Sequence, residues 1–216
     1  IVLILFLCCI HPVLMSQKKL TYLALGDSYT IGEAVPLSEN FPHQTISILE
    51  KKGIMVELPD IVAKTGWSTD ELMEGIRQRN LLQRYDVVSL LIGVNNQYRG
   101  RSVDEYEKEF TTLLETAIRF AGDKPTHVFV LSIPDWGVTP FAEGRDRQKI
   151  GEDIDAFNIV NRRIAGKYGV PYIDITPGSR DATHDPSLIA ADGLHPSGKE
   201  YTKWAEMLAE RMLKTR

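Results

Sequence analysis

Short apolar runs alternate along the chain with amphipathic segments, and this alternation predicts the fold class. Two of the runs, residues 86–92 and 127–133, are apolar at nearly every position. Such continuous runs are typical of strands in a parallel sheet that is covered on both faces. Five runs have the length of a strand: residues 20–25, 54–63 with Pro59 as an interruption, 86–92, 127–133 and 170–175.

The segments between these runs carry apolar residues at helical spacing. One stripe spans residues 103–117, a second 150–164 and a third 201–212, and each predicts a helix with one buried face. Ser68 and Glu71 form a capping-box pattern, which marks the start of another helix. Strands that alternate with helices predict an α/β fold, with a parallel sheet of five strands between two layers of helices.

Length and composition are those of one globular domain. The chain has 216 residues, of which 43% are hydrophobic and 25% charged, and these values are not those of a disordered protein. Residues 17–216 contain no repeat and no low-complexity linker, so we expect a single domain there. The formal net charge is −4 and no basic block occurs, which argues against a nucleic-acid partner.

The beginning of the chain has a different character. Its first ten residues are all apolar or cysteine, a run shorter than the ~20 residues of a membrane span. It fits the apolar core of a signal peptide over residues 1–16, which predicts an exported protein, periplasmic or secreted. The alternatives are a buried first strand or a disordered tag on a cytoplasmic protein. Both cysteines, Cys8 and Cys9, lie here, so the mature chain would have neither disulfides nor cysteine ligands.

The candidate chemistry follows the predicted strands. In an open parallel sheet, binding sites form beyond the carboxyl ends of the strands. Those ends should therefore meet along one edge, although they span most of the chain. The segments that follow the five strands are residues 26–28, 65–67, 93–96, 134–136 and the end of a long loop at 192–195.

These segments contain the groups that a nucleophilic site requires. A serine hydroxyl needs an adjacent base, usually histidine, and a carboxylate that orients the imidazole. Ser28, His195 and Asp192 could supply these three groups. An oxyanion would need hydrogen-bond donors, and the candidates are the backbone N–H groups of Ser28 and Gly66 and the side-chain amide of Asn95.

Four short motifs resemble those of the SGNH/GDSL hydrolase superfamily. Gly-Asp-Ser at 26–28 is similar to its first block, Gly66 to the second, Gly-Val-Asn-Asn at 93–96 to the third and Asp-Gly-Leu-His-Pro at 192–196 to the last. The resemblance implies a flavodoxin-like three-layer α/β/α sandwich. It also implies hydrolysis of acyl esters without a cofactor or metal.

The resemblance assigns a role to each motif residue. Ser28 would be the nucleophile, His195 the base and Asp192 its orienting carboxylate, while Ser28, Gly66 and Asn95 would hold the oxyanion. The chain departs from the family pattern at two positions. Tyr29 follows Gly-Asp-Ser where leucine is usual, and Asn96 stands where aspartate is usual; the second departure concerns the support of the site.

Each motif also has a plainer explanation. Gly-Asp-Ser is a common strand-to-helix turn, and the residues of the last motif could begin a helix with Pro196 in its first position. Asn95 and Asn96 could be ordinary turn residues. Their joint occurrence at corresponding strand ends favours a functional site.

Another Asp-x-x-His, formed upstream by Asp181 and His184, could be a rival pair or part of a metal site. Its histidine lies in mid-loop, with no helix start to hold it. We therefore expect a solvated polar loop at this position.

The substrate is open at this level. The resemblance implies a lipid, a lysophospholipid or a simple acyl ester, with a carbohydrate O-acetylesterase as the alternative. A non-catalytic binding module is the alternative from another class. Trp67, Tyr98 and Trp136 follow strand ends and could contact substrate or pack in the core. The chain lacks the glycine patterns of a phosphate loop, a dinucleotide site and the usual α/β-hydrolase elbow.

Overall fold

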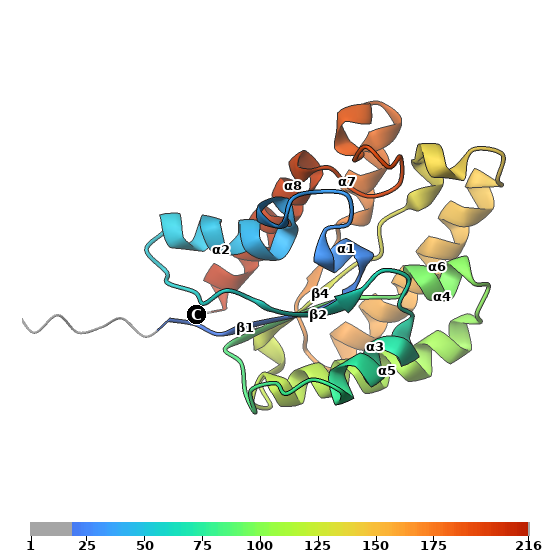
Figure 1. The fold of residues 1–216 in the computed structure, drawn as a ribbon. Helices are drawn as coiled ribbons and strands as arrows, with labels where there is room; N and C mark the ends of the chain where they lie inside the picture. Colours follow the sequence, from blue (N-terminus) through green and yellow to red (C-terminus); the bar gives the residue numbers. More distant parts are fainter. Residues whose placement is uncertain (1–18, 216) are drawn as a thin grey trace, which may run out of the picture.

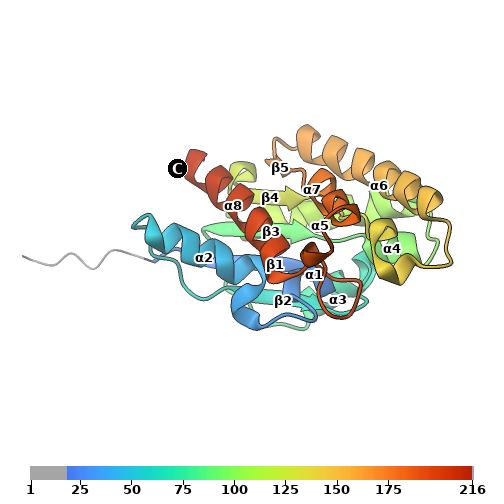
Figure 2. The same cartoon turned by 90° about the horizontal axis from the view of Figure 1, so that it is seen from above.

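The computed structural model describes residues 19–215 and has one five-stranded sheet in that part of the chain. Every neighbouring pair of strands is parallel, and the strand order is β2-β1-β3-β4-β5 (Figure 2). This is the flavodoxin-like order, so the predicted fold class is confirmed. The strands are β1 (Tyr22–Asp27), β2 (Asp60–Lys64), β3 (Val87–Leu91), β4 (Val128–Leu131) and β5 (Tyr172–Ile173).

Helices cover both faces of the sheet and make the three layers (Figure 1). Two helices, α2 (Phe41–Lys51) and α8 (Gly198–Lys214), pack together on one face. The other face is covered by α3 (Thr69–Arg77), α5 (Val103–Phe120) and α6 (Arg147–Lys167).

The predicted helices begin where side chains can cap them. The Ser68–Glu71 capping box is present at α3, and the Ser102 and Asp146 side chains accept backbone N–H groups at the start of α5 and α6. Such caps satisfy amides that have no partner within the helix. The last helix begins at Gly198 with Ser197 as its cap. Pro196 is therefore not its first residue.

The ends of several elements differ from the sequence prediction. The first strand runs on to Asp27, because residues 26 and 27 pair with β2. The second begins only at Asp60, directly after Pro59, since proline has no N–H for the ladder. The fifth is reduced to two residues. The helix whose apolar stripe spans residues 150–164 begins already at Arg147, after a loop that contains two short 3₁₀ helices.

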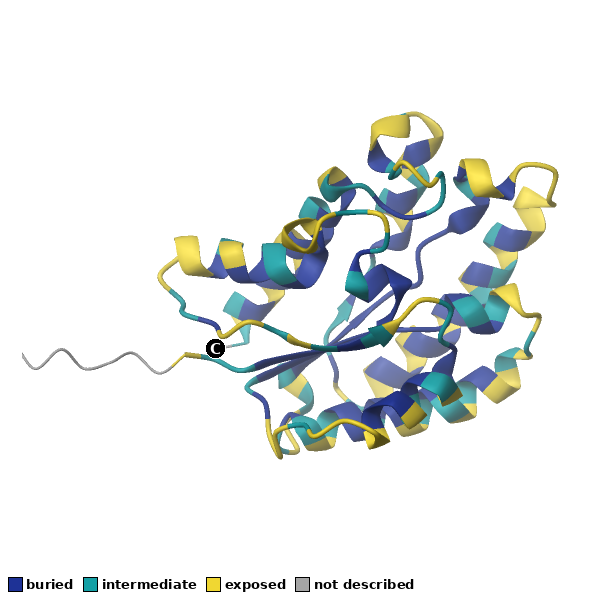
Figure 3. Cartoon of the chain, viewed as in Figure 1, coloured by how far each residue is buried: buried dark blue, intermediate teal, exposed yellow. Residues whose placement is uncertain are grey.

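The core lies against both faces of the sheet (Figure 3). All residues of β3 and β4 are buried, as their continuous apolar runs predict. Because the strands are parallel, their carboxyl ends meet at one edge. The candidate site lies at this edge.

The predicted signal peptide over residues 1–16 lies outside the described residues and stays a prediction. In the part that the structure does describe, no helix is both long and apolar enough to cross a membrane.

Candidate functional site

The Gly-Asp-Ser motif joins the end of β1 to a one-turn helix, α1 (Ser28–Ile31). Gly26 is required by close packing: a Cβ atom there would lie 2.1 Å from Thr30 Oγ1 and 2.4 Å from the Leu91 carbonyl oxygen. Asp27 caps the helix, and its Oδ1 accepts the N–H of Tyr29 at 3.0 Å. Ser28 is thus presented as the first helical residue at the edge of the sheet.

The last motif folds around the carboxylate of Asp192. Its Oδ1 accepts the backbone N–H groups of Leu194 and His195, both at 3.0 Å. Its Oδ2 lies 2.5 Å from His195 Nδ1. The turn passes through Gly193 in the left-handed region, with φ of 73°. Three contacts to one carboxylate therefore hold the imidazole ring in place.

The structure brings Ser28 and this histidine together. His195 Nε2 lies 3.0 Å from Ser28 Oγ, although the two residues are 167 positions apart in the chain. Both side chains are buried. Because an ionised carboxylate can only accept, the ring proton lies on Nδ1 and leaves Nε2 as the acceptor for the serine hydroxyl. Such a series can withdraw the hydroxyl proton as a new bond forms at the serine oxygen.

The pKa values of two carboxyl groups of the motifs, Asp192 and Asp27, are shifted in opposite directions. Burial opposes ionisation of Asp192, but hydrogen bonds from the His195 ring and from two backbone N–H groups outweigh it and lower the pKa of Asp192. For Asp27 burial dominates, and it raises the pKa of this carboxyl to about 7. Asp192 is therefore the carboxylate that can stabilise a protonated imidazole.

Tyr29, the first departure from the family pattern, supports the imidazole from one side. Its ring meets the His195 ring edge-on, with centroids 5.4 Å apart. Behind it lies Trp204 of α8. The tyrosine next to the serine therefore packs between the imidazole and the last helix.

The turn that contains Gly66 is held by side chains from elsewhere. Gly66 has φ of 83°, which favours glycine. Its carbonyl oxygen accepts from Arg99 Nη2 at 2.6 Å. The next carbonyl, that of Trp67, accepts from Asn95 Nδ2 at 3.0 Å. Asn95 lies in α4 (Val94–Tyr98), directly after β3.

Asn96, the second departure, is buried behind this turn. Its amide both accepts the Thr69 N–H at 3.1 Å and donates to Thr69 Oγ1 at 2.6 Å. The same threonine hydroxyl donates to the Glu109 carboxylate of α5. Where the family usually has an aspartate, the Asn96 amide therefore holds Thr69 together with the carboxylate of Glu109. Motif spacing gave no signal for Glu109 or for Arg99.

A cavity of about 170 Å³ opens at the serine. Asn95, Tyr98 and Trp136, which the sequence proposed, lie in its wall, and Phe141 and Leu194 were missed. Trp67 is not among the lining residues. Its ring packs on α3, where a Cβ at Gly75 would lie 2.1 Å from it. The walls consist of Ser28, Tyr29, Val94, Asn95, Tyr98, Trp136, Phe141, Leu194 and His195.

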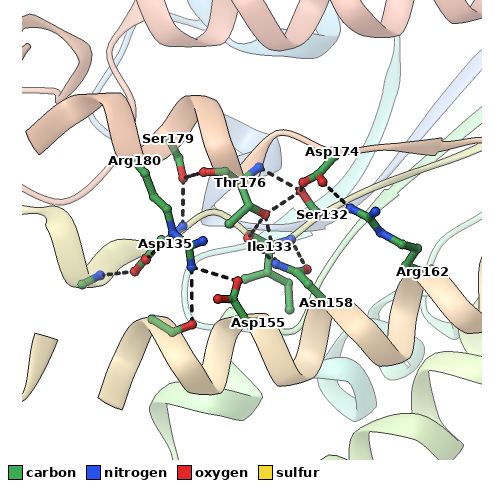
Figure 4. A network of polar contacts seen from close by, with 12 residues as sticks. Ser132, Ile133, Asp135, Asp155, Asn158, Arg162, Asp174, Thr176, Ser179 and Arg180 are labelled. Atoms are coloured by element: carbon green, nitrogen blue, oxygen red, sulfur yellow. Dashed lines mark hydrogen bonds and ion pairs between the residues drawn. The ribbon is translucent and has the colours of Figure 1, made fainter. Parts of the chain in front are cut away.

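An ion pair between the buried Asp135 and the partly exposed Arg180 holds the loop after β4 (Figure 4). Asp135 caps the 3₁₀ helix η3 (Trp136–Val138) through the N–H of Gly137 at 2.8 Å. Its other carboxylate oxygen binds Arg180 Nε at 2.9 Å, and Arg180 also binds Asp155 of α6. The network therefore joins the loop after β4 to α6 and to α7 (Thr176–Arg180).

The same loop contacts the histidine loop directly, because the N–H of Phe141 donates to the carbonyl of Gly193 at 2.9 Å. The aromatic wall and the imidazole are therefore positioned together.

The upstream Asp-x-x-His, Asp181 and His184, is not part of this cavity lining. Asp181 begins the 3₁₀ helix η5 (Asp181–Thr183), and its carboxylate lies 3.7 Å from Lys203 Nζ. His184 is exposed. Over residues 19–215, no group of three or more His, Cys, Asp and Glu side chains is arranged to hold a metal ion.

Comparison with protein families gives one match over most of the chain. The model of the GDSL-like lipase/acylhydrolase family matches residues 24–203. No curated protein sequence matches significantly.

Solved structures with the same fold cover the domain almost completely. The lipase/acylhydrolase from Enterococcus faecalis is 20% identical with a TM-score of 0.68, and 89% of this chain and 94% of that chain are covered. TesA is 16% identical with a TM-score of 0.67, at 91% and 99% coverage. The acetylxylan esterase Axe2 from Geobacillus stearothermophilus is 19% identical with a TM-score of 0.68, at 89% and 94% coverage.

Proposed function

Because the chain belongs to the GDSL-like lipase/acylhydrolase family, we propose that it is a serine esterase that hydrolyses short acyl esters. One observation carries the proposal. The Ser28 hydroxyl lies 3.0 Å from His195 Nε2, whose ring is held through Nδ1 by Asp192, and both Ser28 and His195 line one cavity. A non-catalytic binding module would not require this series of hydrogen bonds.

The reaction proceeds through an acyl-enzyme. Ser28 Oγ attacks the ester carbonyl carbon while its proton passes to His195 Nε2, and Asp192 stabilises the resulting imidazolium. The tetrahedral intermediate collapses as His195 returns the proton to the leaving alcohol. Water then attacks the acyl group, with His195 again as base, and releases the acid and free Ser28. No step requires a cofactor or metal.

Three donors stabilise the oxyanion in this proposal: the N–H groups of Ser28 and Gly66 and the amide of Asn95. The Trp67 carbonyl accepts one hydrogen bond from Asn95 Nδ2 and so orients the amide. The second N–H of the amide serves the oxyanion. Arg99 and the capping box steady the same turn from outside. Such preorganised donors need no rearrangement as charge develops.

The cavity favours a small acyl group. Its volume of about 170 Å³ is below the roughly 300–1,000 Å³ that is typical of sites for drug-sized ligands. A long lipid chain would have to extend beyond it, across the exposed rings of Tyr98 and Phe141.

The same rings supply the observation that favours the second candidate, a carbohydrate O-acetylesterase. Tyr98 and Phe141 are 45% and 41% exposed at the mouth of the cavity. A sugar ring could stack on them while a short acetyl group occupies the cavity beside Ser28.

A fluorophosphonate probe and a series of 4-nitrophenyl esters test the proposal. We expect the probe to label Ser28, and we expect kcat/KM to fall as the acyl chain grows from acetate to palmitate. Ser28→Ala should abolish labelling and turnover, whereas Ser47→Ala, an exposed serine of α2, should retain both. An acetylated xylo-oligosaccharide tests the second candidate. Labelling of another serine would overturn the assignment, and a folded protein with no turnover would support the binding module.

A further inference from the structure

Three aromatic rings at the mouth of the cavity share one cation. The guanidinium carbon of Arg145 lies 5.1 Å from the centroid of Tyr98, 5.3 Å from that of Trp136 and 5.2 Å from that of Phe141. All three rings belong to the cavity wall. Arg145 itself is exposed and lies between the 3₁₀ helix η4 (Pro140–Ala142) and α6.

Among the residues that the structure describes, this guanidinium has no acidic partner. No carboxylate of residues 19–215 lies within ion-pair distance of Arg145, whereas Arg99 and Arg180 near the same site pair with Glu71 and Asp135. Within the same residues its side chain makes one hydrogen bond, from Nη2 to the Tyr98 hydroxyl at 3.2 Å. An arginine side chain has five N–H donors, so most of its donor capacity is open toward solvent at the rim of the cavity.

The aromatic rings make this cation a suitable binding group. Contact with ring faces favours a cation and restricts the guanidinium plane. A restricted guanidinium loses less entropy when its paired N–H groups bind a carboxylate or phosphate side by side. The pairing also costs little desolvation, because the guanidinium is exposed.

We infer that Arg145, Tyr98, Trp136 and Phe141 form an anion subsite, so that the preferred ester carries a carboxylate or phosphate a few bonds from the carbonyl that Ser28 attacks. This inference rests on the proposed esterase function. The three rings and Ser28 line the same small cavity. Arg145 lies over these rings, so the separation between its guanidinium and Ser28 is short. The rings accept the apolar part of the substrate and the guanidinium accepts its charge.

A purely structural role for Arg145 makes a different prediction. If the guanidinium only holds the three rings together, its loss should impair neutral and anionic esters to the same extent. If it binds the anion, the ratio of the two rates should change. The informative quantity is therefore the ratio of kcat/KM between matched esters, not either value alone.

The test uses pairs of esters in which one member is anionic and the other is neutral. On the acyl side, mono-4-nitrophenyl glutarate is compared with its methyl ester. On the alcohol side, 4-acetoxybenzoate is compared with its methyl ester, and 4-acetoxyphenyl phosphate with neutral phenyl acetate. Each rate is divided by the rate of hydroxide-catalysed hydrolysis to remove intrinsic reactivity. The three pairs distinguish carboxylate from phosphate, and the acyl from the alcohol side.

We expect the wild type to prefer the anionic member of at least one pair by about tenfold, and less at high salt, where exposed charges are screened. Arg145→Gln should bring the ratio close to one, and Arg145→Lys should retain part of it. Arg163→Gln removes the same charge from α6, where Arg163 binds Glu107, and should keep the wild-type ratio. A wild type without preference, or an equal loss for both members in Arg145→Gln, would overturn the subsite. Failure to hydrolyse any ester would instead overturn the proposed function.

Discussion

The chain contains Asp-x-x-His twice within fifteen residues, and the two copies have different surroundings. In the second copy the His195 side chain is 8% exposed, with Asp192 on one ring nitrogen and Ser28 on the other. In the first copy His184 is exposed, and Asp181 lies near Lys203 instead. The same spacing has therefore produced one buried series of hydrogen-bonded side chains and one exposed turn.

The difference comes from the backbone around each pair. Residues 190 and 195 are joined by a hydrogen bond from the Ala190 N–H to the His195 carbonyl at 2.7 Å, and Ser197 donates to Leu188 at 2.8 Å. These bonds hold the second copy as a closed loop before α8. The spacing allows a carboxylate to reach its histidine, but only the surroundings decide whether a nucleophile meets the other side of the ring.

The largest expected effect separates the two histidines. His195→Ala removes the proposed base for the Ser28 proton, so we expect kcat to fall by about 10⁴ or more. His184→Ala should stay within about threefold of wild type, which is roughly 0.65 kcal/mol. Both are measured on 4-nitrophenyl acetate after circular dichroism shows a folded protein. Loss of activity in His184→Ala, with activity kept in His195→Ala, would assign the function to the first copy.

The two aspartates extend the comparison. Asp192→Asn retains an oxygen for the loop N–H groups but removes the charge that orients the imidazole, and such a change costs up to about 10⁴ in kcat in a serine hydrolase. Asp181→Asn should change kcat by less than about threefold. Steady-state kinetics on the same ester measures both. Equal losses in the two variants would mean that the carboxylate acts through the fold and not through His195.

A smaller effect is expected within the asparagine pair, where two identical neighbours again differ in surroundings. Asn95→Ala should lower kcat by about 10²–10³ with little change in KM, as for one lost oxyanion donor. Asn96→Ala should lower the melting temperature, because it leaves the N–H of Thr69 without its partner. Its effect on kcat should be smaller than that of Asn95→Ala. Kinetics and thermal unfolding on both variants give the comparison. A greater kcat loss in Asn96→Ala would identify it as the donor.

The smallest effect concerns Asp27, a buried aspartate whose environment differs from those of Asp192 and Asp181. Its pKa is about 7 in the folded protein against a usual value of 3.8. Between these values the folded state keeps a proton that the unfolded state has released, so this group destabilises the fold increasingly as pH rises toward 7. Asp27→Asn should therefore gain about 2–3 kcal/mol relative to wild type between pH 5 and pH 8. Urea unfolding at both pH values measures it, and parallel profiles would contradict the assigned pKa.

Local pattern was sufficient for much of this molecule. The five strands and the main helices follow from the period of apolar residues, because that period depends only on near neighbours in the chain. The parallel arrangement follows from their alternation. The motif residues Ser28, Gly66 and Asn95 could also be placed at strand ends on one edge, since every parallel strand ends on the same side.

Other features depended on packing between distant segments. Trp67 and Trp136 both follow a strand, yet one packs on Gly75 and the other lines the cavity. The supporting residues Arg99 and Glu109 belong to no motif. Arg99 contacts the Gly66 carbonyl and Glu109 contacts Thr69 at the start of α3, and both contacts join segments that are distant in the chain. Contacts with segments that are distant in the chain therefore decide where such a side chain packs.

The centre of the site shows both influences together. Sequence order indicated that His195 and not His184 would serve Ser28, through the helix that begins soon after it. The 3.0 Å contact itself joins residues 167 positions apart, and no local pattern contains that distance. Spacing in the chain selects which residue types can act together, and the packing of α1 and the histidine loop at one sheet edge selects which of them do.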